Sequence, residues 1–142
     1  MLPDEKSYRF VAVLNKKIDN GKLMNALGHM TAGLAGGSGK ADEMHLLEYK
    51  DKDGGVHPHI SHFPFIVLKA ENSNQIRKVR NEALARNILY NDFTSTMTVG
   101  TSEQQQQATR DTIEAELEYY GICLFGKTDE LKEFTGKLSL FN

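Results

Sequence analysis

The chain has 142 residues, of which 39% are hydrophobic and 25% are charged, and its formal net charge is −2. This length and composition are typical of one globular domain and exclude a disordered or fibrous chain. The single cysteine, Cys123, excludes an internal disulfide, and no apolar run approaches the ~20 residues of a membrane span. The polar start is unlike a signal peptide. We therefore expect one cytoplasmic domain over residues 1–142, without membrane association.

The first half of the chain predicts a strand, a long helix and a hairpin. Arg9–Leu14 is short, apolar and β-prone, as expected of a strand in a sheet that helices cover on both faces. Residues 22–35 place leucine and methionine at steps of three and four, which predicts a helix packed on that sheet, ended by the glycines of 36–39. Residues 40–62 predict an excursion from the core, with a hairpin that turns at Asp53-Gly54-Gly55.

The second half alternates further strands and helices. Pro64–Ala70 predicts a buried strand, and Asn72-Ser73-Asn74 predicts the N-cap of a helix whose inward face carries Ile76, Val79 and Ala83/Leu84. The other expected elements are strands at Ile88–Thr94, Tyr119–Phe125 and Leu138–Phe141, a solvated helix turn at Gln104–Gln107 and a short helix at Thr128–Thr135. This alternation predicts an α/β fold, a three-layer sandwich in which helices flank a mixed β-sheet.

Three polar residues share one face of the first predicted helix. Lys22, Asn25 and His29 are spaced three and four apart, away from the apolar stripe, so this face can point into a cleft. A lysine near a helix N-terminus favours an anionic group, and a histidine can transfer protons because its unperturbed pKa is ~6.5. The alternative is a solvent-facing lysine, a helix asparagine and a partly buried structural histidine.

The remaining reactive side chains favour structural interpretations. His57, His59 and His62 form a H-x-H-x-x-H loop that is conceivable as a zinc or nickel site. Residue 62 would need a turn to join the other two, and no cysteine is close in sequence, so loop histidines without a metal are the favoured interpretation. Cys123 lies within a predicted core strand, where a buried thiol is inert. We therefore expect no metal and no cofactor.

Three segments of the sequence together carry a resemblance to a known enzyme family. The first is the strand followed by Gly21-Lys22 at the start of a helix that continues to His29. The second is the strand, helix and strand of residues 64–92, closing on Asp92 and Thr96 in an Asp-x-x-x-Thr pattern. The third is the C-terminal sequence GICLFGKTDELKEFTGKLSLFN. Taken together they resemble the type II peptidyl-tRNA hydrolases, which cleave the ester between a peptide and its tRNA, and this resemblance implies a peptidyl-tRNA hydrolase II-like fold.

Four further segments carry a second resemblance: LNKKIDNGKLMNALGHM, HPHISHFPFIVLKA, YNDFTSTMTVGT and ELEYYGICLFG. Through them, residues 8–141 resemble a bacterial family known as domain of unknown function 2000. It implies family membership without an assigned activity.

The hydrolase resemblance assigns roles to individual residues. Lys22 and Asp92 match the catalytic lysine and aspartate of the hydrolases, and Thr96 matches the threonine near that aspartate. We add His29 as a candidate catalytic residue. The candidate substrate-binding residues are Asn25, Thr94, Thr96 and Tyr120.

The chain also departs from the hydrolase pattern. Gly121 stands where the hydrolases carry a threonine, Ala26 where they carry a glutamine, and Ser95 where they carry an arginine. The excursion at 40–62 and a segment at 102–113 are additions.

Two functional hypotheses follow. The first is a cleft around Lys22 and Asp92 that binds, and hydrolyses without a metal, an anionic ester-type or nucleotide-bearing substrate. The second is a non-catalytic ligand-binding or regulatory module that uses the same cleft. The expected partners are a small-molecule or nucleotide-bearing ligand, with tRNA as one candidate although a net charge of −2 counts against an RNA substrate. A homodimer is expected by analogy with the hydrolases.

Overall fold

A four-stranded mixed β-sheet forms the centre of the computed structural model, which describes all residues from Met1 to Asn142. The strand order is β4 (Phe65–Ala70), β1 (Tyr8–Asn15), β6 (Tyr119–Lys127) and β5 (Leu89–Thr94). β1 runs parallel to β4, whereas β6 runs antiparallel to both β1 and β5. The predicted mixed sheet is therefore confirmed.

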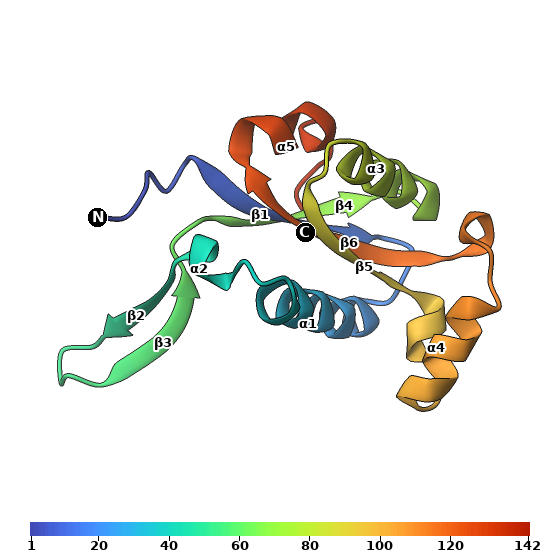
Figure 1. Cartoon of the computed structure of the whole chain (residues 1–142), viewed down its shortest axis with the longest axis horizontal. Helices are drawn as coiled ribbons and strands as arrows, with labels where there is room; N and C mark the ends of the chain where they lie inside the picture. Colours follow the sequence, from blue (N-terminus) through green and yellow to red (C-terminus); the bar gives the residue numbers. More distant parts are fainter.

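Helices cover both faces of this sheet. Figure 1 shows α1 (Asn20–Gly37) on one face and α3 (Ser73–Ala85) with α5 (Thr128–Thr135) on the other. β1 separates the two hydrophobic cores: Phe10, Ala12 and Leu14 pack on the α1 side, while Val11 and Val13 pack on the α3 and α5 side. Because side chains alternate along a strand, an apolar run with no polar interruption fits only a strand covered on both faces. The α/β prediction is confirmed.

The predicted apolar stripe holds α1 on the sheet. Leu23, Met30 and Leu34 are buried, Leu27 is partly buried, and Ala26 is also buried. Each fully buried leucine or methionine contributes roughly 1.5–3 kcal/mol relative to an exposed one. This packing fixes which face of α1 remains open to solvent, and that face carries the polar residues.

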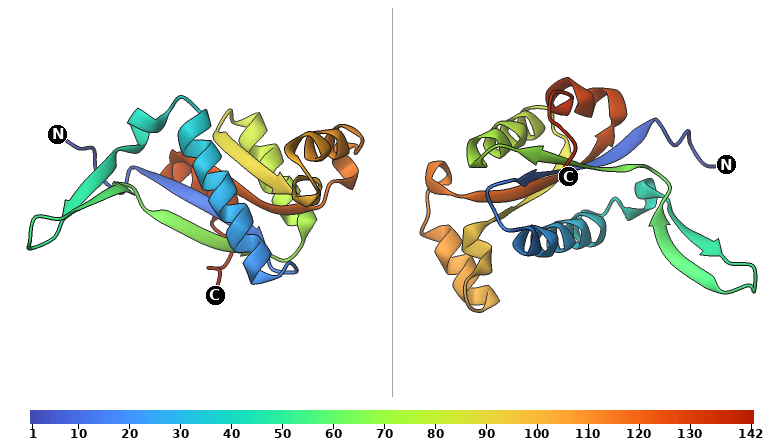
Figure 2. Two further views of the ribbon diagram at one scale, coloured as in Figure 1. Left: turned by 90° about the horizontal axis from the view of Figure 1, so that it is seen from below. Right: turned by 180° about the vertical axis from the view of Figure 1, so that it is seen from behind.

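The predicted excursion forms a short helix and a hairpin. α2 (Ala41–Met44) leads into β2 (Leu46–Lys50), which pairs antiparallel with β3 (Val56–Ser61) in a separate two-stranded sheet. Asp51 closes the turn, because its Oδ1 accepts hydrogen bonds from the backbone N–H groups of Asp53 and Gly55. Figure 2 shows the hairpin extending away from the main sheet, so it does not cover the open face of α1.

The third helix begins as predicted and faces the core with a narrower stripe. Asn72 caps α3, since its Oδ1 accepts from the backbone N–H of Gln75 at 3.0 Å. Ile76, Val79 and Ala83 are buried, but Leu84 is half exposed. The predicted inward position of Leu84 is wrong. Each step along an α-helix rotates the side-chain direction by about 100°, so Leu84 points away from the core when Ala83 points into it.

The predicted terminal strand at Leu138–Phe141 is reduced to one bridge. Leu140 forms an isolated antiparallel bridge to Leu68, with hydrogen bonds from Lys69 N to Ser139 O and from Phe141 N to Val67 O, each 2.9 Å. Two hydrogen bonds on either side of one residue make a bridge and no continuous ladder. The segment therefore covers the outer edge of β4, which is otherwise free to pair with another chain.

The segment between β5 and β6 forms three short helices. They are η1 (Ser95–Thr98), α4 (Ser102–Arg110) and η2 (Glu114–Glu116). α4 begins at a capping box, in which the Thr101 side chain accepts from Gln104 N and the Gln104 side chain accepts from Thr101 N. None of its residues is buried, which confirms a solvated helix at the glutamine tract. No helix in the structure has the length and apolar character needed to cross a membrane.

Candidate functional site

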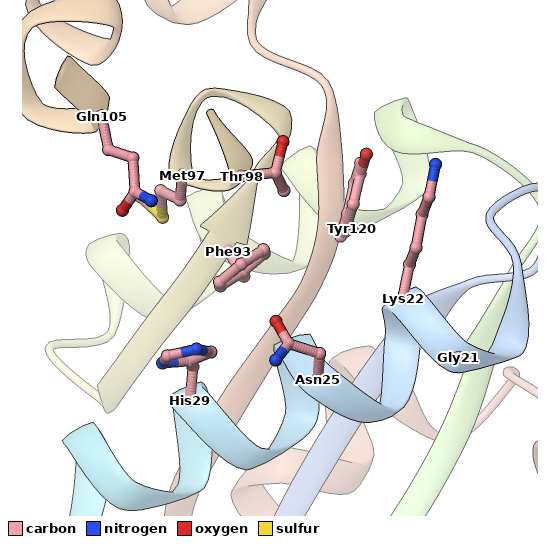
Figure 3. A pocket seen from close by; sticks show the side chains of 9 residues that line it. All are labelled: Gly21, Lys22, Asn25, His29, Phe93, Met97, Thr98, Gln105 and Tyr120. Carbon is pink, nitrogen blue, oxygen red and sulfur yellow. The ribbon is translucent and has the colours of Figure 1, made fainter. Parts of the chain in front are cut away.

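A cavity of about 540 Å³ lies between the N-terminal half of α1, the end of β5 and the η1–α4 segment. Its walls come from parts of the chain that are far apart in sequence. The lining residues are Gly21, Lys22, Asn25, His29, Phe93, Met97, Thr98, Gln105 and Tyr120. Figure 3 shows Phe93 at the centre, with the α1 side chains along one side and Met97, Thr98 and Gln105 on the other.

The polar face of α1 supplies the charge of this cavity. Lys22, Asn25 and His29 all line it, so the three residues singled out by their helical spacing lie together. No carboxylate oxygen lies within 4.0 Å of the Lys22 ammonium group, and no aspartate or glutamate lines the cavity. The lining of the cavity also includes Gly21 and Lys22, in the first turn of α1, and this turn carries no acidic residue beyond the N-cap Asp19, whose side chain forms no cap hydrogen bond. The cavity therefore has a positive end.

A β-bulge brings Tyr120 into the cavity. Phe93 pairs with Gly121, and the next residue, Thr94, pairs with Tyr119, so Tyr120 is an extra residue in β6. The extra residue breaks the alternation of side chains, and Tyr120 and Gly121 both face α1. Tyr120 is a candidate that the sequence had placed near the cleft, and the bulge is the feature that turns its ring toward Lys22 rather than toward α3.

Aromatic rings form the floor of the cavity. The ring of Phe93 stacks on that of His29, with centroids 5.8 Å apart, and lies 5.9 Å from that of Tyr120. Met97 lies beside Phe93 and adds a polarizable thioether to the same surface. The floor therefore offers an apolar surface in the same cavity as Lys22, which suits an organic anion better than a bare inorganic ion.

Thr94 and Thr96 do not line the cavity but fix its outer wall. The Thr96 Oγ1 lies 2.7 Å from Thr94 Oγ1 and 2.8 Å from Thr109 Oγ1. Because Thr109 donates its own hydroxyl hydrogen to Gln105 O, it accepts from Thr96, which in turn accepts from Thr94. This chain of hydroxyl groups ties the end of β5 to α4 and so positions Gln105 over the cavity. Their role in direct substrate binding stays a prediction.

The structure does not bring Asp92 together with Lys22. The Asp92 side chain faces α3, where its Oδ2 accepts a hydrogen bond from Arg80 Nε at 3.1 Å in a partly buried ion pair. Asp92 pairs with Ile122, a residue of the α3-side core, whereas its neighbour Phe93 faces α1. The predicted cleft therefore contains Lys22 but not the Asp92 side chain. Side chains alternate between the two faces of the sheet along β5, so the sheet lies between the two residues.

Burial raises the pKa of Asp92 above its ordinary value of 3.8, and the attraction of Arg80 offsets only part of this effect. Compared with the unfolded chain, the folded state therefore disfavours the charged form of this carboxyl group. The contribution of Asp92 to the folding stability is greatest below pH 3.8 and falls as the pH rises through the raised pKa, because the buried carboxyl group then has to ionise.

Asp92→Asn, which mimics the protonated carboxyl group, is accordingly expected to leave the free energy of unfolding at about pH 7 unchanged or increased. Relative to wild type, the variant should gain stability as the pH rises from 3.8 through the raised pKa of Asp92, which urea unfolding at a series of pH values measures. A variant that instead loses stability over this range would show that the Arg80 ion pair outweighs the burial of the charge.

Two positions at which the sequence departs from the hydrolase pattern lie in the core. Ala26 is fully buried on the sheet side of α1. A Cβ atom added to Gly121 would lie 2.9 Å from both Leu14 Cδ2 and Met30 Cε. The small residues at 26 and 121 therefore let α1 approach the sheet closely, and neither lines the cavity.

The predicted histidine loop is mostly a strand, since His57 and His59 lie in β3, and its three histidines do not converge on one point. His57 Nε2 contacts Asp51 Oδ2 at 2.8 Å within the hairpin, while His62 Nε2 contacts Pro3 O at 2.7 Å. His59 lies near α2, and no group of three metal-ligating side chains forms in the structure. The His57 hydrogen bond lowers the pKa of Asp51.

Cys123 is fully buried in β6, as its sequence context predicted. Burial raises the pKa of its thiol to about 12, so it carries no thiolate at neutral pH.

Five residues of the cavity were not among the candidate site residues: Gly21, Phe93, Met97, Thr98 and Gln105. Phe93 and Met97 are common core residues, and Gln105 sits in a tract that is otherwise solvent-exposed. Gln105 differs from its neighbours in lining the cavity, because α4 lies across the cavity from α1. No sequence pattern encodes that position of α4.

Residues 8–142 match the family model described as Protein of unknown function (DUF2000). The chain belongs to the DUF2000 family. No curated protein matches it. Among solved structures it is similar to a protein of unknown function from Agrobacterium tumefaciens strain C58, Atu0240, with a TM-score of 0.81 and 17% sequence identity. That match covers 96% of this chain and 98% of the other. At this identity the likeness establishes a shared fold, so any activity must be inferred from the site of this DUF2000 member itself.

Proposed function

We propose that the chain is a ligand-binding module that holds a small organic anion in the cavity between α1 and α4. The observation that carries the proposal is Lys22, an ammonium group without an acidic partner in a cavity that no carboxylate lines. Asn25 and the Tyr120 hydroxyl add polar groups at the same end, and Phe93 with Met97 supplies the apolar floor. A few polar groups over an apolar surface is the usual construction of a small-molecule site.

Nuclear magnetic resonance titration with sodium phosphate and with hexanoate tests this proposal. We expect both anions to shift the amide signals of Gly21–Asn25 and of residues near Tyr120, with hexanoate also shifting signals near Phe93 and Met97. Shifts spread evenly over the lysines of the surface, or no saturable shift at all, would contradict a built anion site.

A second candidate function is hydrolysis of an anionic ester in the same cavity. It is supported by His29, whose imidazole lines the cavity with Lys22 and makes no hydrogen bond within the chain, so it is free to take a proton from water. The Gly21-Lys22 helix start and the mixed sheet between helices support the predicted likeness to type II peptidyl-tRNA hydrolases. Asp92 has no part in this version, since its carboxylate binds Arg80.

Turnover of peptidyl-tRNA or of a p-nitrophenyl ester of succinate separates the two candidates. Hydrolysis by the wild type that is lost in His29→Gln and retained in Asp92→Asn supports the enzyme. Saturable anion binding without turnover supports the binding module alone.

A further inference from the structure

The β2–β3 hairpin stands apart from the rest of the fold. Its two strands form a sheet of their own, and Figure 2 shows this sheet extending away from the main domain. A two-stranded hairpin is marginally stable in water, and three or more strands with an apolar face are needed for independent stability. The hairpin nevertheless carries large apolar side chains that are between 41% and 57% exposed: Leu46, Tyr49, Val56 and Ile60. Exposed apolar side chains gathered on one element are typical of an interaction surface.

The two strands of the hairpin differ in their capacity to pair with another chain. β3 contains Pro58, which has no N–H group to donate to a ladder. β3 is also bulged, since the three steps from His57 to Ile60 lie opposite two steps of β2. Proline and bulges protect an edge strand from further pairing. β2 contains neither, so its outer edge is the one that remains open to another strand.

Alternate residues of β2 present their backbone groups at this open edge. The N–H group of Asp51 donates to Gly55 O at 2.9 Å, across the hairpin. Backbone direction alternates along an antiparallel strand, so Tyr49 also turns its backbone groups toward β3. Glu48 and Lys50 therefore direct their N–H and C=O groups outward, where the fold supplies no strand to pair with them.

The charges of β2 suit a second copy of the same strand. If two copies pair antiparallel about a two-fold axis at Tyr49, Glu48 of each copy lies opposite Lys50 of the other. Opposite charges at such cross-strand positions are stabilising, and like charges are destabilising. Moving the axis to residue 48 or to residue 50 places Glu48 against Glu48 or Lys50 against Lys50. The charges therefore select one register, in which the two Tyr49 rings also meet at the closely spaced position of the ladder.

We propose that the chain forms a homodimer through β2, in which two hairpins join into a four-stranded antiparallel sheet with Tyr49 at the two-fold axis. Antiparallel pairing places the two main domains at opposite ends of the joined sheet, because each hairpin extends away from its own domain. The hairpin belongs to the segment that is an addition to the hydrolase pattern, so this contact is independent of that resemblance. It is also independent of the proposed anion site.

Sedimentation velocity over a concentration series tests this dimer with two charge variants. Glu48→Lys places lysine opposite lysine in both cross-strand contacts, and Lys50→Glu places glutamate opposite glutamate. We expect each variant alone to dimerise roughly tenfold more weakly than the wild type, because two attractive pairs become repulsive. An equimolar mixture of the two variants restores opposite charges at both contacts, so it should dimerise within about threefold of the wild type.

The matched control for Lys50→Glu is Lys78→Glu. Lys78 is exposed on α3, far from the hairpin in the fold, and its replacement changes the net charge by the same amount. We expect this variant to dimerise within about twofold of the wild type. Hydrogen exchange supplies an independent measurement, since the amides of Glu48 and Lys50 should gain protection as the dimer forms while those of β3 should not.

Three results would overturn the proposal. The first is a wild type that stays monomeric at millimolar concentration, which would leave the edge of β2 to a different chain. The second is a dimer that survives both single variants or that Lys78→Glu weakens equally. The third is a mixture of the two variants that stays monomeric, because complementary charges at Glu48 and Lys50 would then have no part in the contact.

Discussion

Replacing Lys22 with glutamine is expected to weaken the binding of phosphate and hexanoate by about 10- to 100-fold. Glutamine keeps much of the length of the side chain and removes its charge. A hydrogen bond to a charged group contributes about 1.5–3 kcal/mol, and each 1.4 kcal/mol corresponds to a tenfold change in affinity. Lys22 is the residue on which the whole anion site depends, since no other lysine or arginine lines the cavity.

The matched control is Lys78→Gln. Lys78 is exposed on α3, on the opposite face of the sheet, and it forms no ion pair. The Lys78→Gln variant changes the net charge by the same amount as Lys22→Gln. Because salt screens attraction over this distance, its affinity for both anions should remain within about twofold of that of the wild type. Titrations of both variants at one ionic strength check this, and equal weakening in the two variants would mean that the anions bind by general electrostatic attraction.

Introducing threonine at Gly121 is expected to reduce the free energy of unfolding by about 3 kcal/mol, at the upper end of the range for overpacked cores. The added Cβ would lie 2.9 Å from Leu14 Cδ2 and Met30 Cε and 3.1 Å from Val13 O. The side chains can shift, but the backbone carbonyl belongs to β1, which is paired on both edges. α1 must therefore move away from the sheet, and urea unfolding measures the loss.

Gly126→Thr is the control on the same strand. The nearest atom to an added Cβ at Gly126 is Leu131 Cδ2 at 3.5 Å, an ordinary van der Waals contact. Threonine is also a good strand residue, so we expect a change within about 0.5 kcal/mol of wild type. If Gly121→Thr unfolds at the same urea concentration as Gly126→Thr, the close approach of α1 at Gly121 is not what stabilises this packing.

Most elements could be predicted because their signals are local. The apolar run of β1, the leucine and methionine spacing of α1 and the cap at Asn72 each predict a structure from a few neighbouring residues. The same spacing placed Lys22, Asn25 and His29 on one helix face, and the structure shows them lining one cavity. Helical periodicity alone is sufficient for such a grouping.

The position of Asp92 could not be predicted from this kind of signal. Its strand alternates between α1 and α3, and the sequence does not state which residue of the pair Asp92 and Phe93 faces which helix. The ion pair between Arg80 and Asp92 forms because α3 packs on the face of the sheet to which Asp92 points. This arrangement joins distant segments, and the resemblance to the hydrolases had paired Asp92 with Lys22 instead.

The sequence by itself determined the α/β alternation, the buried thiol of Cys123 and the shared face of Lys22, Asn25 and His29, because each depends on the period of a helix or strand. Only the tertiary structure decided which groups meet that face. A single extra residue in β6 turns Tyr120 toward α1, and a chain of three threonine hydroxyls positions α4 so that Gln105 lines the cavity. These contacts join segments far apart in the chain, and their geometry is set by packing of the whole sheet rather than by any local pattern.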